Sequence, residues 1–336
     1  MIEAIDVHTH IFAPAWPDFA ARFGGDRCPR LEGDPSTGCK LYLGATFNRN
    51  LTPHAFDPAR RVEDMDRTEV ATQLLSPAPP TFCYWAPPAA AAEWHRMQND
   101  VIADIVARHP RRFLGAAGLP LQAPDLAVKE LERVVRTLRF PAVEIGANVD
   151  GRDLDDPSLD PLWTAAAALD VAVLVHPQAP ILGDPRFRKD NLTQVAGFPL
   201  ETALAMTRVI FGGVLQRWPA IRWCFAHGGG AFPYILPRLD KGWQVVDAAR
   251  AAIPEPPSHY VRRVWIDSLT HSPRVLAFAL DTFGSERIVL GSDYPFKLGV
   301  DDPVAELDRL GLDAAARRRL TTDNARDLLG LPTAGG

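Results

Sequence analysis

Short apolar runs alternate with longer amphipathic segments along the whole chain. The short runs are rich in β-branched residues, which is typical of buried strands. The longer segments carry apolar residues at helical spacing, and several follow Asp-Pro or Ser-Pro pairs that favour a helix start. The pattern predicts strands at residues 3–9, 71–77, 113–119, 142–147, 171–176, 221–227, 263–268 and 287–292. It predicts helices at 58–68, 90–109, 124–138, 158–169, 197–217, 232–250, 272–283 and, in pieces, 301–329.

Eight strands that are each followed by a helix predict an α/β protein with the (β/α)₈ TIM-barrel fold. An open, doubly wound sheet would show the same alternation. However, no glycine-rich dinucleotide-binding fingerprint follows the first predicted strand. Barrels of this kind reach the length of this chain as one unit, so we expect residues 1–336 to form a single domain.

Two segments interrupt the alternation. Residues 11–56 contain five prolines and only one strand-like run, KLYLG at 40–44, which predicts an insertion that folds over the active site. Residues 178–196 form a second long segment directly after the fifth strand. Long loops on this face of a barrel usually shape the substrate pocket.

Polar side chains capable of binding a metal stand at the carboxyl ends of four predicted strands. They are His8, His10, His176, His227 and Asp293. The carboxyl ends of barrel strands meet on one face, and residues two apart on a strand project to the same side. The set therefore predicts one divalent metal held by His8, His10, His176 and Asp293. His227 is expected to transfer protons, with a fifth ligand as the alternative.

The metal count and identity follow from the residues present. Barrel hydrolases with two metals often bridge them through a modified lysine in the fourth strand, and residues 142–147 contain no lysine. A single metal is therefore expected. Nitrogen and oxygen ligands favour Zn²⁺ first and Mn²⁺ second.

The composition of the chain limits the binding partners and the cellular compartment that we expect. A net charge of −5 and a pI near 6.0 give no basis for binding nucleic acid or a membrane surface. Apolar runs stay short of the ~20 residues of a membrane span, and no leader pattern opens the chain. The four cysteines lack CxxC spacing, which favours reduced thiols. We therefore expect a cytoplasmic enzyme with a small-molecule substrate.

Several longer motifs in the sequence indicate a resemblance to a known protein family. The HTH at 8–10, TFCYW at 81–85, CFAHGGGAFPY at 224–234 and LGSDYPF at 290–296 resemble the amidohydrolase superfamily. More narrowly, they resemble its amidohydrolase 2 branch, around aminocarboxymuconate-semialdehyde decarboxylase. The resemblance implies the same four metal ligands, and it implies that His227 activates a metal-bound water or moves a proton. Some members carry Glu at the first HxH position, so His8 resembles the zinc-dependent members more.

The resemblance also implies how substrate is held. The semialdehyde decarboxylase of this branch uses two arginines for substrate carboxylates. Arg238 corresponds to one that reaches a neighbouring subunit's site, which implies a homodimer. Arg49 lies near the place of the other, within the insertion. Trp85 and Phe296 are expected to line an apolar pocket suited to an aromatic or conjugated acid.

These observations together predict a mononuclear metal-dependent enzyme. It would remove CO₂ without oxidation from a small unsaturated or aromatic carboxylic acid, with His227 and Asp293 as catalytic residues. The alternative is a hydrolase or hydratase that uses the same metal on a lactone, an amide or a double bond. A non-catalytic binding protein would be expected to have lost part of the ligand set, and this sequence retains all of it.

Overall fold

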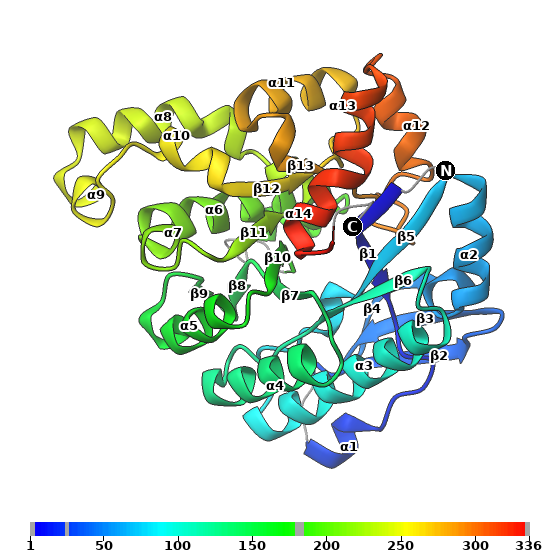
Figure 1. Ribbon diagram of the computed structural model, residues 1–336. Helices are drawn as coiled ribbons and strands as arrows, with labels where there is room; N and C mark the ends of the chain where they lie inside the picture. The colour runs from blue at the N-terminus through cyan, green and yellow to red at the C-terminus, as the bar shows by residue number, and fades with distance from the viewer. Residues whose placement is uncertain (1–3, 24–26, 179–184, 333–336) are drawn as a thin grey trace.

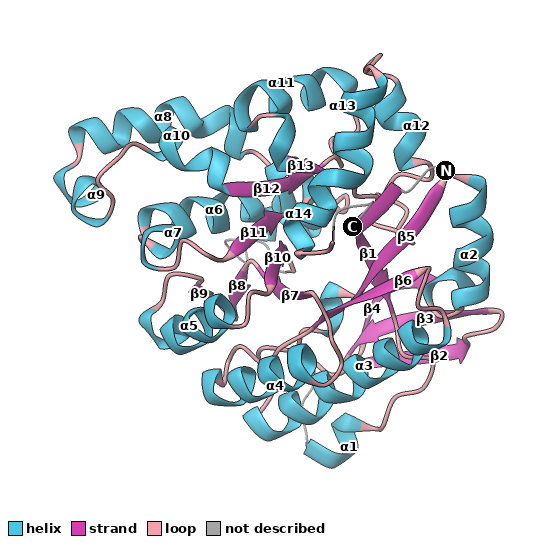
Figure 2. Ribbon diagram, in the orientation of Figure 1, coloured by secondary structure: helices cyan, strands magenta, loops and turns pink. Residues whose placement is uncertain are grey.

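Eight parallel strands form the centre of the protein. The computed structural model describes residues 4–23, 27–178 and 185–332. The strands, in sheet order, are β1 (Ala4–Ile11), β5 (Val70–Pro77), β6 (Phe113–Ala117), β7 (Ala142–Gly146), β10 (Ala172–His176), β11 (Arg222–Phe225), β12 (Val264–Asp267) and β13 (Ile288–Val289). Helices surround them on the outside (Figures 1 and 2). All eight predicted strands are present.

The sheet closes on itself through backbone hydrogen bonds that follow β13. The Val7 N–H donates to the Leu290 carbonyl over 2.9 Å, and the Asp293 N–H donates to the His8 carbonyl over 2.8 Å. The first strand therefore lies beside the last, and the predicted (β/α)₈ barrel is confirmed.

The predicted helical segments all contain helix. The main outer helices are α2 (Pro58–Arg67), α3 (Pro88–Arg108), α4 (Pro124–Arg136), α5 (Asp160–Ala168), α6 (Phe198–Phe211), α8 (Phe232–Val245) and α11 (Pro273–Phe283). The segment predicted at 197–217 splits into α6 and α7 (Val214–Arg217), because Gly213 takes a left-handed φ of 71° that ends the first helix. The segment predicted at 232–250 likewise divides into α8 and α9 (Asp247–Ala252).

The lower interior of the barrel is filled by one apolar cluster to which all eight strands contribute. Its strand residues are Ile5, Val7, Leu74, Ala116, Ala142, Ala172, Leu174, Cys224, Trp265 and Val289. The C-terminal part of the chain consists of α12 (Pro303–Asp308), α13 (Ala314–Arg318), a π-helical turn at Arg319–Asp323 and α14 (Asn324–Leu329). Ala325, Leu328 and Leu329 of α14 join the same cluster, so this helix closes the bottom of the barrel.

A register shift in β1 lies between the residues that pack inside the barrel and the residues that face the candidate metal site. Ile5 and Val7 belong to the interior cluster, whereas His8 and His10 reach Asp293 at the top of the barrel. In a regular strand, side chains point alternately to the two faces, so odd-numbered and even-numbered residues cannot both face the interior of the barrel. The pairing of β1 with β5 is irregular between Asp6 and Thr9, as at a β-bulge. Such irregularities often redirect side chains next to active sites.

The insertion is more ordered than its sequence indicates. It contains a short helix, α1 (Phe19–Phe23), and an antiparallel sheet of β2 (Pro29–Asp34), β3 (Gly38–Leu43) and β4 (Thr46–Leu51). Only β3 was predicted, from the run at 40–44. The strands β2 and β4 carry several polar residues and are largely exposed, so they lack the apolar signal of a buried strand. A cluster that includes Cys39, Leu41 and Leu51 packs the sheet against Phe12 and Ala78 of the barrel.

No helix among residues 4–23, 27–178 and 185–332 combines the length and apolarity that crossing a bilayer requires.

Arg61 of α2 is a fully buried cation that joins the insertion to the barrel. Its guanidinium donates to the carbonyls of His54 and His10 and to Gln73 Oε1, the last over 3.1 Å. It also lies 4.7 Å from the centre of the Tyr294 ring. Burial lowers the pKa of Arg61 to about 10, so it is charged at neutral pH.

Replacing Arg61 with Met should destabilise the fold, because two buried acceptors and one partly buried acceptor lose their donors. We expect Arg61→Met to lower the free energy of unfolding by about 2–4 kcal/mol in denaturant titrations of metal-free protein. The control is Arg60→Met one residue earlier, where the side chain is 47% exposed and pairs with Asp57. That change should cost less than about 0.5 kcal/mol. Equal losses in the two variants would contradict this account of Arg61.

Candidate metal centre and active site

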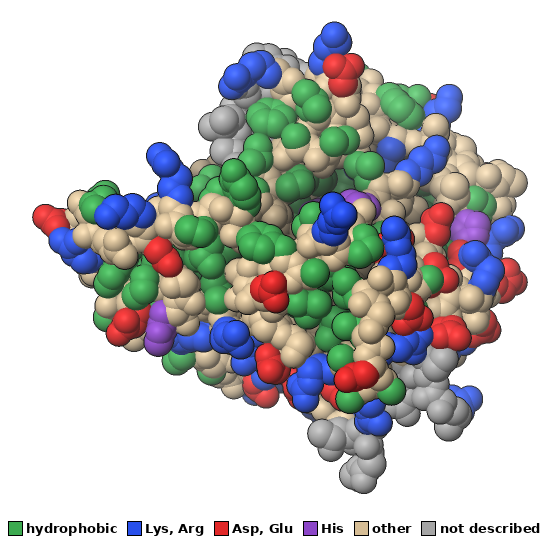
Figure 3. Space-filling view, turned by 90° about the horizontal axis from the view of Figure 1, so that it is seen from above, with side chains coloured by type: hydrophobic (Ala, Val, Ile, Leu, Met, Phe, Trp, Pro, Cys, Tyr) green, Lys and Arg blue, Asp and Glu red, His purple; other side chains and the backbone are tan. Residues whose placement is uncertain are grey.

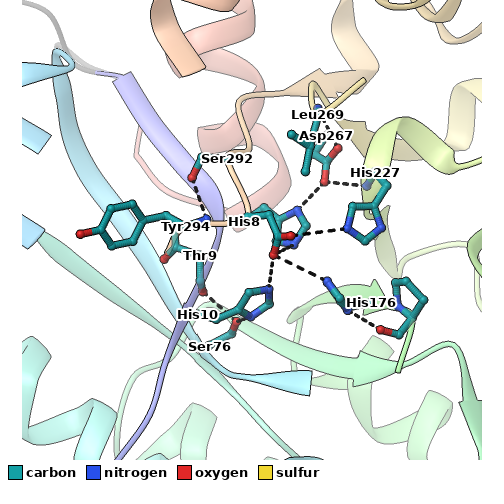
Figure 4. A network of polar contacts seen from close by, with 12 residues as sticks. His8, Thr9, His10, Ser76, His176, His227, Asp267, Leu269, Ser292 and Tyr294 are labelled. Carbon is teal, nitrogen blue, oxygen red and sulfur yellow. Dashed lines mark hydrogen bonds and ion pairs between the residues drawn. The ribbon is translucent and has the colours of Figure 1, made fainter. Parts of the chain in front are cut away.

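Three imidazoles and one carboxylate converge at the top of the barrel. His8 and His10 come from the end of β1, His176 ends β10, and Asp293 follows β13. Asp293 Oδ1 lies 3.1 Å from His10 Nε2, 3.4 Å from His8 Nε2 and 4.0 Å from His176 Nε2. One donor atom from each of the four buried residues lies within 4.8 Å of the other three (Figure 4).

The other nitrogen of each ring faces an acceptor. His8 Nδ1 lies 2.6 Å from Asp267 Oδ2, His176 Nδ1 lies 2.6 Å from the Pro177 carbonyl, and His10 Nδ1 lies 3.1 Å from Ser76 Oγ. These contacts favour a proton on Nδ1, which leaves a lone pair on each Nε2.

Among the residues that the structure describes, the converging atoms have no hydrogen-bond partner. The Nε2 atoms of the three histidines and Oδ1 of Asp293 are all buried and unsatisfied. Leaving four polar atoms without partners in a protein interior is costly, and buried polar atoms are almost always paired. Three nitrogens and one carboxylate oxygen form a donor set that suits a divalent cation. The residues therefore fit the metal that the sequence predicts.

The pKa shifts of the four converging residues also fit a cation site. Burial alone would raise the pKa of Asp293, but the surrounding imidazoles, His10 first, hold it well below its usual range. Burial lowers the pKa of His10 to about 4 and that of His176 well below its usual value. Burial opposes protonation of His8 as well, but the carboxylates of Asp267 and Asp293 raise its pKa. The site thus contains an ionised carboxylate beside two neutral imidazoles.

His227 stands beside this group but outside it. Its Nε2 is 3.9 Å from Asp293 Oδ2, and its ring centre is 4.9 Å from that of His176. The residue begins a tight turn in which its own φ is 58°, and Gly228, Gly229 and Gly230 also have positive φ. At Gly230 a Cβ atom would lie 2.1 Å from the Pro199 carbonyl oxygen, so this position requires glycine.

A cavity of about 740 Å³ opens above these residues, and His176, His227 and Asp293 lie on its wall. The insertion contributes Leu43, Phe47 and residues 48–52 to the wall. The segment after β10 contributes Gln178, Asn191 and residues 193–195, while residues 179–184 of that predicted loop lie outside the described residues. The hollow in Figure 3 is bordered by hydrophobic side chains, with a histidine surface visible inside.

Arg49 and Phe296 meet inside the cavity. Arg49 is on β4 of the insertion, and Phe296 follows the Asp293 turn. The guanidinium carbon of Arg49 lies 4.5 Å from the centre of the Phe296 ring, and the Phe296 ring centre lies 5.3 Å from that of His10. Burial lowers the pKa of Arg49, and the charge of Asp293 opposes this effect. Both predicted substrate-binding residues therefore line the cavity, close to the metal-binding group.

Two other predicted substrate-binding residues lie elsewhere. Trp85 packs in a separate cluster with Phe19, Cys28 and Trp94, and it borders a second, small cavity. It does not line the large cavity, because the insertion covers this part of the barrel, so Trp85 is not retained as a substrate contact. Arg238 is exposed on α8 and does not line the large cavity of its own chain.

Three polar residues of the site were not singled out in the sequence. Asp267 ends β12, and Ser76 and Glu144 lie in β5 and β7. Ser76 Oγ donates to Glu144 Oε2 over 2.9 Å, and Glu144 Oε1 lies 3.5 Å from His10 Nδ1. Burial raises the pKa of Glu144 to about 8. All three lie in predicted strands, and Ser76 and Asp267 lie near the carboxyl ends of theirs, whereas Glu144 lies in the middle of its strand.

The amidohydrolase profile matches residues 5–331. The chain belongs to the amidohydrolase family. This confirms the resemblance that the HxH, AHGGGAFP and GSDYPF motifs carry.

Similar proteins in this family are decarboxylases by name. A 2-amino-3-carboxymuconate-6-semialdehyde decarboxylase from Dictyostelium discoideum is 36% identical over 329 residues, which cover 97% of this chain and 91% of that protein. A gamma-resorcylate decarboxylase from Polaromonas sp. is 30% identical over 295 residues, covering 81% of this chain and 87% of that protein.

A crystal structure of a dihydroxybenzoic acid decarboxylase from Polaromonas sp. has the same fold. It superimposes with a TM-score of 0.81 at 24% identity and covers 99% of this chain and 98% of that one. That crystal contains manganese and the inhibitor 2-nitroresorcinol.

A buried carboxylate supports the cavity wall from behind. The Nε2 of Gln178, which lines the cavity, donates to the Asn148 carbonyl over 3.1 Å. Asn148 Nδ2 in turn donates to Glu201 Oε1 over 2.6 Å, and Glu201 Oε2 has no partner within residues 4–23, 27–178 and 185–332. Glu201 is 2% exposed, and burial raises its pKa to about 7.

Glu201 should make the fold less stable as the pH rises. Its usual pKa is 4.5, so between pH 4.5 and about 7 the folded state holds a proton that the unfolded state has released. Stability therefore falls with rising pH across this window. Glu201→Gln cannot titrate, so its free energy of unfolding relative to wild type should increase by roughly 1–3 kcal/mol from pH 5 to pH 8. Exposed Glu132→Gln should give a constant difference, and a constant difference for Glu201→Gln would refute the prediction.

Proposed function

We propose that this protein is a mononuclear metal-dependent decarboxylase that removes CO₂ without oxidation from a small unsaturated or aromatic carboxylic acid. One observation carries the proposal. Four buried lone pairs without partners face one another beside His227, at a cavity large enough for such an acid. Membership in a family whose similar members are decarboxylases supports the reaction class.

The residues that would hold the cation are His8, His10, His176 and Asp293. We propose Zn²⁺ because three imidazoles and one carboxylate are a common zinc donor set, while Mn²⁺ favours sites richer in oxygen. The manganese in the Polaromonas decarboxylase makes Mn²⁺ the alternative, and elemental analysis of purified protein separates the two. When bound, the cation supplies a concentrated positive charge at the mouth of the barrel.

Arg49 and Phe296 would orient the substrate. The guanidinium presents paired N–H donors that match the two oxygens of a carboxylate. The neighbouring Phe296 ring offers a flat apolar surface for a conjugated or aromatic group. Both line the cavity on the side of the metal-binding residues, so a substrate carboxylate on Arg49 would lie near Asp293.

His227 would supply the proton. When the carbon–carboxylate bond breaks, CO₂ leaves and the electron pair stays on the carbon, which must then gain a proton. The His227 side chain is 15% exposed and lines the cavity, so it can meet that carbon from the cavity wall. Asp293, 3.9 Å from His227 Nε2, would stabilise the protonated imidazole before transfer. Hydrolysis or hydration would use the same groups, and the assay is CO₂ release against ring opening or hydration of the same candidate acids.

Two histidine variants should separate metal binding from proton transfer. We expect His176→Ala to lose bound metal, because one of four ligands is gone. We expect His227→Ala to keep the metal and to release CO₂ about 10²–10⁴-fold more slowly. Metal content by elemental analysis and CO₂ release by the purified variants test this. Loss of metal from His227→Ala would identify His227 as a ligand, and wild-type protein that stays active after exhaustive chelation would end the proposal.

We also propose a homodimer in which Arg238 completes the partner's site. Arg238 is exposed on α8, one helical turn after Tyr234, which lines the cavity of its own chain. Large apolar side chains around that cavity are also exposed, among them Tyr234 at 84%, Val195 at 54% and Phe278 at 47%. Covering them with a second copy would remove apolar surface from water.

Mixed dimers test this arrangement. Arg49→Gln and Arg238→Gln should each lower kcat/KM about 10- to 100-fold, through loss of charged hydrogen bonds. If Arg238 acts across the interface, co-expressed variants form hybrid dimers with one intact site, so a statistical mixture should recover about a quarter of wild-type activity. The control is Arg49→Gln mixed with the double variant, which contains no intact site in any pairing. A mixture that stays as inactive as its parents would place both arginines in one chain.

We propose a reducing, cytoplasmic location, since Cys39, Cys83 and Cys224 are buried free thiols. The expected partners are a small carboxylic acid and a second copy of the chain, without nucleic acid or membrane.

A further inference from the structure

Asp267 contacts both the ring of His8 and the backbone of the turn that carries His227 (Figure 4). It ends β12 and is 1% exposed. Its Oδ2 lies 2.6 Å from His8 Nδ1 and accepts the His227 backbone N–H over 2.9 Å. Its Oδ1 accepts the backbone N–H groups of Gly228 and Leu269 over 2.8 and 3.0 Å.

This contact set requires an ionised carboxylate. Three of the four contacting groups are backbone N–H donors, which cannot reverse direction. The fourth is the Nδ1 of His8, which must carry a proton if its Nε2 is to offer a lone pair. Four donors therefore converge on two oxygens, and only an acceptor on both sides satisfies them. Burial would raise the pKa of Asp267, but the hydrogen bond with His8 and the nearby imidazoles lower it.

We propose that Asp267 is the positioning residue that fixes the metal-binding His8 and the proton-transferring His227 relative to each other. The inference rests on the roles proposed above for these two histidines. One carboxylate oxygen contacts both the His8 ring and the His227 backbone, so neither can shift without straining the other contact. The second oxygen holds Gly228 and Leu269, which fixes the turn at the end of β11 against β12.

The sequence provides the space that this contact needs. A Cβ atom at Gly291 would lie 2.7 Å from Asp267 Cβ and 2.9 Å from His8 Cβ. Real Cβ atoms do not approach this closely, so any larger residue would force Asp267 and His8 to move. Glycine is therefore needed in the LGSD motif so that Asp267, at the end of β12, and His8, on β1, can meet across the chain that follows β13.

Asparagine at position 267 has one acceptor where aspartate has two. If its oxygen stays on Gly228 and Leu269, its NH₂ group faces the His227 N–H and His8 Nδ1. Two donors then meet at His227, and His8 is favoured in the tautomer with Nε2 protonated, which cannot bind metal. If the amide is reversed, the same conflict arises at Gly228 and Leu269. In the first case His8 and the His227 backbone lose their acceptor, and in the second case the turn that carries His227 loses its hold on Gly228 and Leu269.

The test is Asp267→Asn in the full-length enzyme, with three measurements. Zn²⁺ affinity by chelator competition should weaken about 10- to 100-fold. Hydrogen exchange of the backbone amides of His227, Gly228 and Leu269 should accelerate in metal-free protein. The kcat for CO₂ release should stay below that of wild type even at saturating Zn²⁺. The reason is that the variant displaces His227 in addition to weakening Zn²⁺ binding.

Two further variants guard against a general folding defect. Asp155→Asn removes another largely buried carboxylate, 10% exposed and paired with Arg208 at 2.6 Å, far along the chain from the metal site. It should lower the melting temperature without changing Zn²⁺ affinity or these amide exchange rates. Gly291→Ala retains the carboxylate but crowds it, and should weaken Zn²⁺ binding as Asp267→Asn does.

The outcomes separate this inference from the proposed function. Wild-type affinity for Zn²⁺ and unchanged amide exchange in Asp267→Asn would overturn the role of Asp267. Equal loss of affinity in Asp155→Asn and Asp267→Asn would reduce that role to general stability and overturn it too. Wild-type protein that binds neither Zn²⁺ nor Mn²⁺ would defeat the proposed function instead, while faster amide exchange in Asp267→Asn would still support its hold on the His227 turn.

Discussion

The site depends on the mutual approach of four buried ligand atoms that find no hydrogen-bond partner among the described residues. The Nε2 atoms of His8, His10 and His176 face Asp293 Oδ1 at 3.1–4.0 Å, and none of them is hydrogen-bonded. Such an arrangement is unfavourable for the protein alone and favourable around a positive ion. The closed barrel holds the four atoms together because each is attached to a strand or turn that cannot move independently of its neighbours.

The acceptors behind the rings are as important as the rings. Asp267, Ser76 and the Pro177 carbonyl each occupy the Nδ1 side of one histidine, and they differ in kind: a carboxylate, a hydroxyl and a backbone carbonyl. Only the first is charged. His8 is therefore held more strongly than its two companions, and it is also the ring whose anchor reaches the His227 turn.

Much of this organisation could be predicted from the sequence, for identifiable reasons. All eight strands were predicted because parallel strands are buried on both faces and read as continuous apolar runs. The four metal-binding residues were predicted because each ends such a run. In contrast, β2 and β4 of the insertion are exposed and polar, and the shift within β1 leaves no compositional trace. Trp85 was misplaced, because its neighbours in space come from the insertion and α3, which spacing along the chain does not reveal.

The origin of Arg49 has a consequence for how this enzyme could have diversified. Every group assigned to the chemistry belongs to the barrel, whereas Arg49 belongs to the small antiparallel sheet that packs onto it. With the role proposed for Arg49, selection can remodel that sheet and change which acid is accepted, while the groups proposed for the reaction stay the same. A family built this way would be expected to share one reaction while its members differ in substrate.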